Sequence, residues 1–311
     1  MKSDSTLKTK LESALTSRDH RHIRRRLPDF LTSELLIDFT SNDYLSLSTS
    51  HHLRNHFLFK LSIAPHVLGS AGSRLLVNGP AHAQLEDRLR LFFATESALL
   101  FNSGFDANVG FFSCIPQKGD VIVHDEYVHA SVHDGMHASR VDRECLIPFA
   151  HNSVEALRLA LTTARNRIEN GQSVFVAVES LYSMDGTFAP LTEMVEVIDE
   201  IFPAGNAYFI VDEAHSTGIY GPQGRGRVAM LGLENRVLAR LHTFGKALAA
   251  SGAVIVTNTV VRDYLLNYAR PLIYTTSPTY ATIIAADASF DMLIDGTASY
   301  VRLLSLVCLL I

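Results

Sequence analysis

The stretch Ala207-Tyr208-Phe209-Ile210-Val211-Asp212-Glu213-Ala214-His215 passes from an apolar run to acidic residues and a histidine. A continuous apolar run is typical of a strand that is buried on both faces, as in a parallel sheet. Asp212 and His215 stand where such a strand would end, and open α/β sheets bind ligands beyond the carboxyl ends of their strands. The stretch therefore predicts an α/β fold and indicates which edge of the sheet carries the functional site.

The rest of the chain alternates between two kinds of pattern. Short apolar or β-branched runs predict strands at Leu36–Phe39, Ser97–Asn102, Asp120–His124, Ser173–Glu179, Tyr208–Asp212 and Val237–Thr243. Residue patterns of helical type predict helices at Lys8–Arg26, Ala83–Phe93, Asn108–Ile115, Ala130–Ala138, Ser153–Arg167 and Leu191–Phe202. This alternation favours a mainly parallel sheet covered by helices on both faces.

Composition limits the classes of protein to be considered. The chain has 311 residues, of which 47% are hydrophobic and 19% charged, so it is long enough for a large core and for two domains. The formal net charge is -5, which gives no basic field for nucleic acid. The short basic run from Arg18 to Arg26 is typical of a solvated helix face. We therefore expect no nucleic-acid partner.

The cysteines and the two ends bear on the compartment. Cys114, Cys145 and Cys308 show neither metal-binding nor redox spacing, which favours a reducing compartment. The polar start, Met1–Lys10, lacks the apolar core of a secretory signal, and the apolar end, Leu303–Ile311, is too short to span a membrane. We therefore expect a cytoplasmic protein with no membrane partner, and we leave organellar targeting open.

A second informative stretch is Thr243–Gly252, which contains Lys246. Its residues are mostly small and include Gly245 and Gly252, so the backbone can pack close to a flat ligand. A lysine in such a place suits a Schiff base with a carbonyl cofactor. A lysine for an aldehyde carbon and an aspartate for a pyridinium nitrogen are the two protein groups that pyridoxal 5'-phosphate (PLP) most needs. Lys246 and Asp212 therefore predict PLP as the cofactor.

Two turns at strand ends are candidates for smaller roles. Ser103–Asp106 lies between a strand and a helix, and the N–H groups at such a helix start can hold a phosphate. In Glu179–Gly186, Ser183 could donate a hydrogen bond to a ligand. Taken alone, either stretch is explained at least as well by a plain turn.

Two other interpretations of the polar residues have to be weighed. Asp212–His215 also spells the Asp-Glu-Ala-His box of helicases, but a nucleoside triphosphatase needs a Gly-x-x-x-x-Gly-Lys-Ser/Thr loop, and Gly245-Lys246 is followed by Ala247. We therefore prefer the cofactor interpretation.

His129, His133 and His137 recur at four-residue spacing, which would place them on one helix face. They could form a metal site, a surface run of imidazoles, or a group in which only His129 faces and stacks on a ligand. We favour the third, because the other motifs also stand at strand ends, and we expect no metal ion.

Eight motifs together resemble one family, the α-oxoamine synthases, which are PLP-dependent enzymes of fold type I related to class II aminotransferases. The motifs are Asn42–Leu45, Gly69–Arg74, Phe101–Phe105, His129–Ser131, Ser183–Gly186, Asp212–Gly218, Gly224–Gly226 and Thr243–Lys246. The resemblance implies a mainly parallel seven-stranded sheet flanked by helices, and a homodimer with its active site at the subunit interface. It is greatest to the branch that condenses L-alanine with a pimeloyl thioester of CoA or ACP, with decarboxylation, to 8-amino-7-oxononanoate in biotin biosynthesis. A related synthase with another pair of amino acid and acyl-CoA is the alternative.

The resemblance also implies a role for each matching residue. Lys246 would form the Schiff base and move the proton, and Asp212 would pair with the pyridinium nitrogen. His129 would stack on the cofactor ring and His215 would hydrogen-bond its hydroxyl group. The remaining positions are Ser183 at the ring edge, Thr243 with the backbone of Gly104 and Phe105 at the phosphate, Thr276 at the phosphate of the neighbouring subunit, and Arg24 at the substrate.

By the same resemblance we expect three parts. These are an N-terminal helix and arm at 1–45, a large PLP-binding domain at 46–270, and the start of a C-terminal domain at 271–311. The match stops near Pro278, whereas members of the family continue through a longer C-terminal domain, so we expect that domain to be truncated. The missing part supplies an arginine for the amino acid's carboxylate, and a cofactor-binding remnant without turnover is therefore a rival hypothesis.

Overall fold

The computed structural model describes residues 6–27, 38–69 and 71–298. Contacts divide the chain into two units, Met1–Thr40 and Ser41–Ile311. In the first unit, helix α1 spans Thr6–His20 and buries none of its residues. The helix stops short of the predicted Arg26 because His22 adopts a left-handed conformation, with φ of 55°. The strand expected at Leu36–Phe39 lies mostly outside the described residues.

The second unit is built on a seven-stranded sheet with the order β1-β7-β6-β5-β4-β2-β3. Its strands are β1 (Ser97–Phe101), β2 (Val121–Asp125), β3 (Leu146–Phe149), β4 (Val174–Glu179), β5 (Ala207–Asp212), β6 (Ala239–Thr243) and β7 (Ala253–Thr257). All neighbouring pairs are parallel except those of β7, which runs antiparallel to both β1 and β6. The expectation of a mainly parallel α/β sheet is confirmed.

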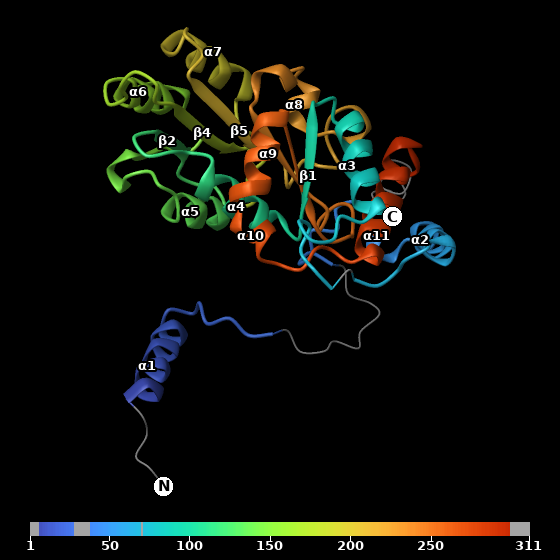
Figure 1. The fold of residues 1–311 in the computed structure, drawn as a ribbon. Coiled ribbons are helices and arrows are strands. Elements are labelled where there is room, and N and C mark those ends of the chain that lie inside the picture. Colours follow the sequence, from blue (N-terminus) through green and yellow to red (C-terminus); the bar gives the residue numbers. More distant parts are fainter. Residues whose placement is uncertain (1–5, 28–37, 70, 299–311) are drawn as a thin grey trace, which may run out of the picture. The chain divides into compact units, whose positions relative to one another are not determined.

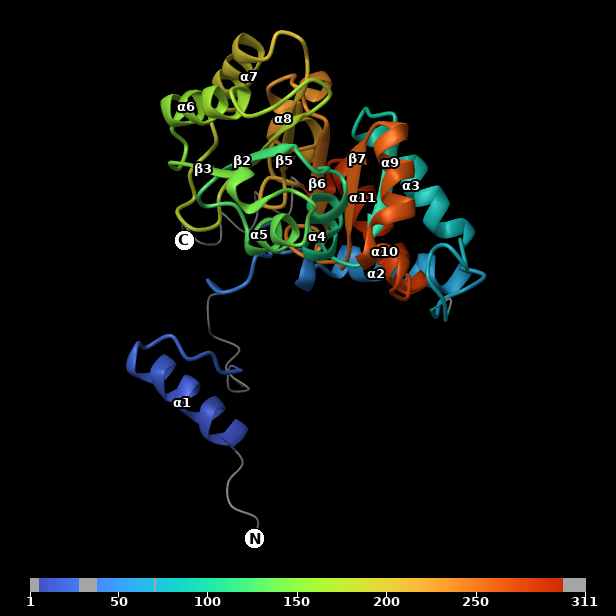
Figure 2. The same cartoon turned by 60° about the vertical axis from the view of Figure 1, so that its left-hand side comes forward.

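Helices cover both faces of this sheet. They are α2 (His51–Ile63), α3 (Pro80–Phe92), α4 (Gly104–Cys114), α5 (Ala130–His137), α6 (Val154–Arg165), α7 (Leu191–Ile201), α8 (Arg227–Met230), α9 (Thr259–Tyr268), α10 (Arg270–Ile273) and α11 (Tyr280–Ile294). Short 3-10 segments occur at Leu47–Thr49, Arg143–Cys145, Pro222–Gly224 and Glu234–Arg236. In Figures 1 and 2, α6 and α7 lie across β2, β4 and β5 from α4 and α5, while α2, α3 and α11 gather near β1.

Hydrophobic burial fixes which residues face each layer. One cluster joins α4, α5 and α9 to one face of the sheet, for example through Phe111 and Leu265. On the other face, α6 and α7 pack over β2, β4 and β5, and α3 and α11 pack over β1 and β7. Because both faces are covered, β2 and β4 are buried throughout, and most of their residues are apolar.

The topology brings several chain segments to one edge of the sheet. The ends of β4 and β5 are in register, with Glu179 opposite Asp212. Helix α4 begins at Gly104, directly after β1, and the loop that follows β6 carries Lys246. The carboxyl ends of the parallel strands therefore meet at the positions that the sequence marked. Within the described part of the chain, every helix is too short or too polar to cross a lipid bilayer.

Candidate functional site

A cavity of about 150 Å³ lies at this carboxyl edge. It is lined by Gly104, Phe105, Asn108, His129, Ser131, Glu179, Asp212, Ala214, His215, Leu241, Thr243 and Lys246. These residues come from the ends of β4, β5 and β6 and from the first turns of α4 and α5. The cavity therefore lies where an open α/β sheet binds its ligand.

Lys246 reaches the cavity from the loop between β6 and β7. Its Nζ lies 2.8 Å from Nε2 of His215. Burial lowers the pKa of the amine, and the carboxylates of Asp212 and Glu179 oppose that shift. Desolvation of this kind makes the neutral, nucleophilic amine easier to form.

His215 connects the lysine to a tyrosine. Its Nδ1 lies 2.8 Å from the hydroxyl of Tyr44, and only 8% of the residue is exposed. Burial, together with the charges of Lys246 and His129, lowers the pKa of His215 to about 4. The imidazole is therefore neutral at physiological pH, with one donor nitrogen and one acceptor nitrogen.

Asp212 is held from two sides. Its Oδ2 accepts a hydrogen bond from the Asn108 side-chain amide at 2.8 Å, and its Oδ1 accepts one from the Ala214 N–H at 2.9 Å. The same Asn108 amide donates to Ser131 Oγ at 3.0 Å, and Ser131 Oγ lies 2.7 Å from His129 Nδ1. A chain of hydrogen bonds, buried from Asp212 to Ser131, thus fixes the carboxylate relative to the ring of His129.

Glu179 places a second carboxylate in the cavity. It is 3% exposed, and burial together with the charge of Asp212 raises its pKa, while Lys246 acts in the opposite direction. Two acidic groups at the ends of adjacent strands favour a proton on one of them. Glu179 therefore adds a group that can hold a proton beside Lys246.

The far end of the cavity suits an anion. The first N–H groups of α4, from Gly104 and Phe105, have no carbonyl partner within the helix, and its dipole favours negative charge there. A Cβ added at Gly104 would come 3.4 Å from Thr243 Oγ1, so the helix start and β6 approach closely. This end can accept a phosphate.

Comparisons with known proteins agree with this geometry. The family described as "Aminotransferase class I and II" matches residues 34–303. The 8-amino-7-oxononanoate synthase of Emericella nidulans is 48% identical over 301 residues, which are 94% of this chain and 72% of that protein. The chain belongs to the class I and II aminotransferase family.

Further relatives place it among the α-oxoamine synthases of that family. The aminoacyl transferase sphA of Aspergillus fumigatus is 44% identical over 266 residues, covering 84% of this chain but only 56% of that protein. A solved serine palmitoyltransferase of S. paucimobilis, with PLP and myriocin bound, shares 27% identity and has a TM-score of 0.78. That match covers 93% of this chain and 73% of the solved chain. The aminotransferase-like fold type I and PLP as the cofactor of the family are thus confirmed.

The residues in the cavity fit this cofactor. Lys246 and Asp212 supply the amine and the carboxylate, and the start of α4 with Thr243 supplies an anion site. The hydrogen bonds on Asp212 Oδ1 and Oδ2 come from protein donors that would stay in place beside a ring. Such a donor set matches a pyridine ring that carries a phosphate and an aldehyde.

Two of the residues assigned by resemblance do not line the cavity, and a third belongs to the other unit of the chain. Ser183 is exposed in the turn after β4 and does not line the cavity. Thr276 is also exposed, and its carbonyl oxygen accepts a hydrogen bond from the Asn102 side chain at 2.8 Å. Arg24 lies in the Met1–Thr40 unit and pairs with Asp19 at 2.5 Å. Their proposed roles stay predictions.

The structure adds residues that the sequence did not single out. Asn108, Ser131 and Glu179 line the cavity: Asn108 donates to Asp212 and to Ser131, and Glu179 lies opposite Asp212 on the next strand. Glu179 ends a predicted strand next to that of Asp212, a signal that could have been used. Asn108 gives no such signal, because its partner is distant in sequence.

The histidine repeat forms no metal site in the described part of the chain, where no group of three or more His, Cys, Asp or Glu side chains could hold a metal ion. His133 packs its ring against His124 at 5.1 Å, while only His129 lines the cofactor cavity. The placement agrees with the interpretation in which His129 alone faces the ligand.

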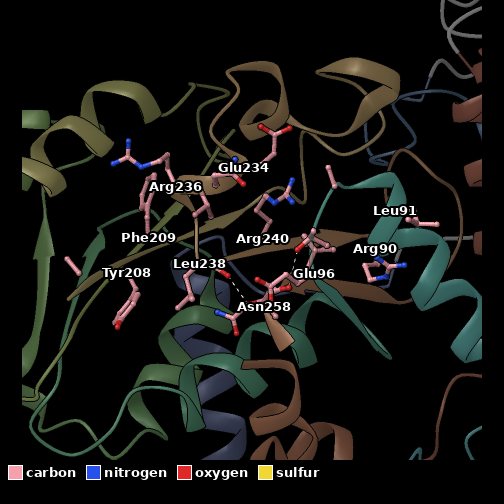
Figure 3. A pocket seen from close by; sticks show the side chains of 17 residues that line it. Arg90, Leu91, Glu96, Tyr208, Phe209, Glu234, Arg236, Leu238, Arg240 and Asn258 are labelled. Carbon is pink, nitrogen blue, oxygen red and sulfur yellow. Dashed lines mark hydrogen bonds between the residues drawn. The ribbon is translucent and has the colours of Figure 1, made fainter. Parts of the chain in front are cut away.

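A larger cavity, of about 730 Å³, lies at the opposite edge of the sheet (Figure 3). It is lined by the starts of β5 and β6, the end of β7 and the end of α3. Figure 3 shows Arg90 and Arg236 on opposite sides of this amino-edge cavity. Arg90 pairs with Asp87 at 2.7 Å, and Arg236 pairs with Asp199.

Arg240 is the buried cation of the amino-edge cavity. Its Nη2 donates to the carbonyl oxygen of Phe93, at the end of α3, at 2.8 Å. A cation at this place satisfies one of the last carbonyls of the helix and complements its dipole. The three arginines of this cavity thus each have a partner within the chain, although Nη1 of Arg240 is buried without one.

Proposed function

We propose that this chain is the PLP-binding part of an acyltransferase that condenses L-alanine with a pimeloyl thioester of CoA or ACP. Decarboxylation would give 8-amino-7-oxononanoate for biotin biosynthesis. The observation that carries the proposal is the 48% identity to an 8-amino-7-oxononanoate synthase, which spans the whole cavity with Lys246, Asp212, His215 and His129.

The proposed chemistry uses the cavity residues in distinct ways. When bound, PLP would supply an electron sink that stabilises negative charge at Cα of the amino acid. Lys246, with its lowered pKa, would take the Cα proton at Nζ. Asp212, fixed by Asn108, would hold a proton at the ring nitrogen. The start of α4 would bind the phosphate and so orient the whole group.

In the overall reaction, Cα of alanine forms a bond to the acyl carbon of the thioester. The thiol leaves with a proton, the carboxyl group of alanine leaves as carbon dioxide, and a proton takes its place at Cα. A neutral His215 can accept or donate a hydrogen bond beside Lys246 without adding positive charge. Burial of Asp212 and partial burial of Lys246 limit competition by water.

The proposal extends to assembly and compartment. We infer a homodimer. In this assembly Thr276, in the motif Tyr274–Ser277, would reach the phosphate that the neighbouring subunit binds. We also place the reaction in the cytoplasm or an organelle, as the cysteine pattern suggests. The domain limits at residues 45 and 270 stay predictions.

A second candidate is a related synthase with another amino acid and acyl-CoA. The 44% identity to the aminoacyl transferase sphA and the structural similarity to serine palmitoyltransferase favour it. The cavity described above lies at the cofactor, so it does not distinguish between acyl chains.

The test is product formation by the purified chain with PLP. One reaction receives L-alanine with pimeloyl-CoA or pimeloyl-ACP, and the matched reaction receives L-serine with palmitoyl-CoA; mass spectrometry identifies the products. We expect 8-amino-7-oxononanoate only in the first, and none with Lys246→Ala. Product only in the second would overturn the pimeloyl assignment, and cofactor binding without product in either would favour the non-catalytic hypothesis.

A further inference from the structure

Tyr44 lies in the motif Asn42–Leu45, one of the eight motifs that resemble the family. Its hydroxyl donates to Asn42 Oδ1 at 2.9 Å and lies 2.8 Å from His215 Nδ1. On the other side of the imidazole, Nε2 lies 2.8 Å from Lys246 Nζ. A single line of hydrogen bonds therefore runs from Asn42 to the lysine.

Hydrogen-bond chemistry fixes the direction of this line. An ammonium group has donors and no acceptor, so protonated Lys246 must donate to Nε2 of His215. The single proton of the Tyr44 hydroxyl goes to Asn42, so the hydroxyl oxygen can only accept from His215. The neutral imidazole then carries its proton on Nδ1, and Tyr44 is its acceptor.

We propose that Tyr44 is a positioning residue that holds His215 in the Nδ1–H tautomer and thereby sets the proton affinity of Lys246. This inference rests on the proposed function, since it concerns the amine that would react. Without the hydroxyl, Nδ1–H would be a buried donor with no partner. The imidazole proton would then move to Nε2, which faces Lys246. An N–H group at that position repels an ammonium group, so the neutral form of Lys246 becomes more favourable.

The other charged groups near Lys246 stay unchanged when Tyr44 is altered. Asp212 and Glu179 face the amine, while Lys246 and His129 face the imidazole. Burial raises the pKa of Tyr44, so its hydroxyl is protonated and neutral. Tyr44→Phe therefore removes no charge, and a change in the lysine has to pass through His215.

The experiment compares Tyr44→Phe with the wild-type chain without cofactor. The ring ¹⁵N shifts of His215, assigned with His215→Gln, report the tautomer. The pH dependence of acylation at Lys246, followed by mass spectrometry, reports the pKa of the amine. We expect Tyr44→Phe to move the proton to Nε2 and to lower the Lys246 pKa by about 0.5–1, the equivalent of one hydrogen bond.

The matched control is Tyr127→Phe. Tyr127 also stacks near a histidine, with its ring 4.3 Å from that of His151, but it lies outside the residues that line the cavity. This variant should change neither signal. An unchanged tautomer together with an unchanged Lys246 pKa in Tyr44→Phe would overturn the proposal.

Should Tyr44→Phe fail to fold by circular dichroism, Asn42→Ala gives the same test without a change of charge. The Tyr44 hydroxyl proton, which Asn42 accepts, would then be free to go to Nδ1 of His215, so the imidazole proton should move to Nε2 and the Lys246 pKa should fall. A rise or no change would contradict the proposal. Neither readout needs substrate, so a failure here leaves the acyltransferase proposal standing, and the absence of product leaves this one testable.

Discussion

The two edges of the sheet carry cavities of very different character. The cavity at the carboxyl edge measures about 150 Å³, and that at the amino edge about 730 Å³. In the smaller one, Lys246, His215, Asp212 and Glu179 face a common space, and burial together with the neighbouring charges shifts the pKa values of Lys246, His215 and Glu179. In the larger one, the described cations pair with neighbouring acids or with a helix end. Convergence of polar groups, and not volume, therefore marks the candidate site in this fold.

Replacement of Lys246 should have the largest effect on the function of the smaller cavity. Lys246→Ala loses both the amine that would bind the cofactor and the group that moves the proton. We expect turnover to fall by on the order of 10³-fold or more. The visible absorption spectrum of the PLP-treated chain should lose any band that depends on a lysine linkage. An identical spectrum in the variant would show that the cofactor is held by another residue.

Neutralising Asp212 should have the second-largest effect on activity. Asp212→Asn keeps the size of the side chain and its bond to the Ala214 N–H but removes the charge that would hold a ring proton. We expect kcat to fall by about 10²- to 10³-fold with a smaller change in KM, because charge in the transition state is affected most. Steady-state kinetics beside Asp87→Asn, an exposed acid paired with Arg90, would reveal whether any lost acid has this effect.

His215, in the smaller cavity, should make the stability of the chain depend on pH. The folded chain favours neutral His215, whose pKa falls from 6.5 to about 4, so its contribution is complete above pH 6.5 and is lost as the pH falls towards 4. The free energy of unfolding should fall by about 3 kcal/mol over this pH range. Urea unfolding of the cofactor-free chain at pH 7 and pH 4 should show a smaller acid loss in His215→Gln than in the wild type. Equal losses in both chains would contradict the assignment.

At the amino edge, substitutions should affect stability and leave the cofactor alone. Arg240→Met removes the hydrogen bond to the Phe93 carbonyl, and we expect the free energy of unfolding to fall by about 1–2 kcal/mol. Arg240→Lys, which keeps a donor, should lose less. The PLP spectrum should be the same in all three chains, and a change in it would mean that the two edges are coupled.

The smallest effect is expected at the rim of the larger cavity. Arg236 and Asp199 form an ion pair with both side chains about half exposed. Arg236→Ala should change the free energy of unfolding by less than about 1 kcal/mol, because water and salt screen exposed pairs. A larger loss in a denaturation curve would indicate that this cavity organises more of the fold than its exposure suggests.

The sequence predicts the parts of the fold in which a local pattern matches the final environment. β4 and β5 follow from their apolar runs, and α6 and α7 from residues spaced along one face. By contrast, α11 is apolar almost all round, because α2, α3 and the sheet surround it, so its pattern has no clear period. The sequence analysis did not predict β7, although Ala253–Thr257 has the β-branched composition of a strand.

The site shows the same division. Lys246, Asp212 and His215 were found because motifs at strand ends carry them. Asn108 and Ser131 act through contacts between α4, α5 and β5, which lie far apart along the chain. Such contacts depend on the packing of whole elements, and a single sequence gives no direct record of them.

The position of β7 has a consequence for how the protein assembles during synthesis. β1 is an edge strand whose sheet neighbour is β7, so Ser97 pairs with Thr257 at a great distance along the chain. The helix that follows β1 carries Gly104, which has to meet Thr243 of β6. The ribosome must therefore deliver the chain through Thr257 before β1 can join the sheet. In a nascent chain that pauses before β7, Asp212 and Glu179 could already be in place. The start of α4, which forms the anion-binding end of the cavity, would not yet be held against the sheet.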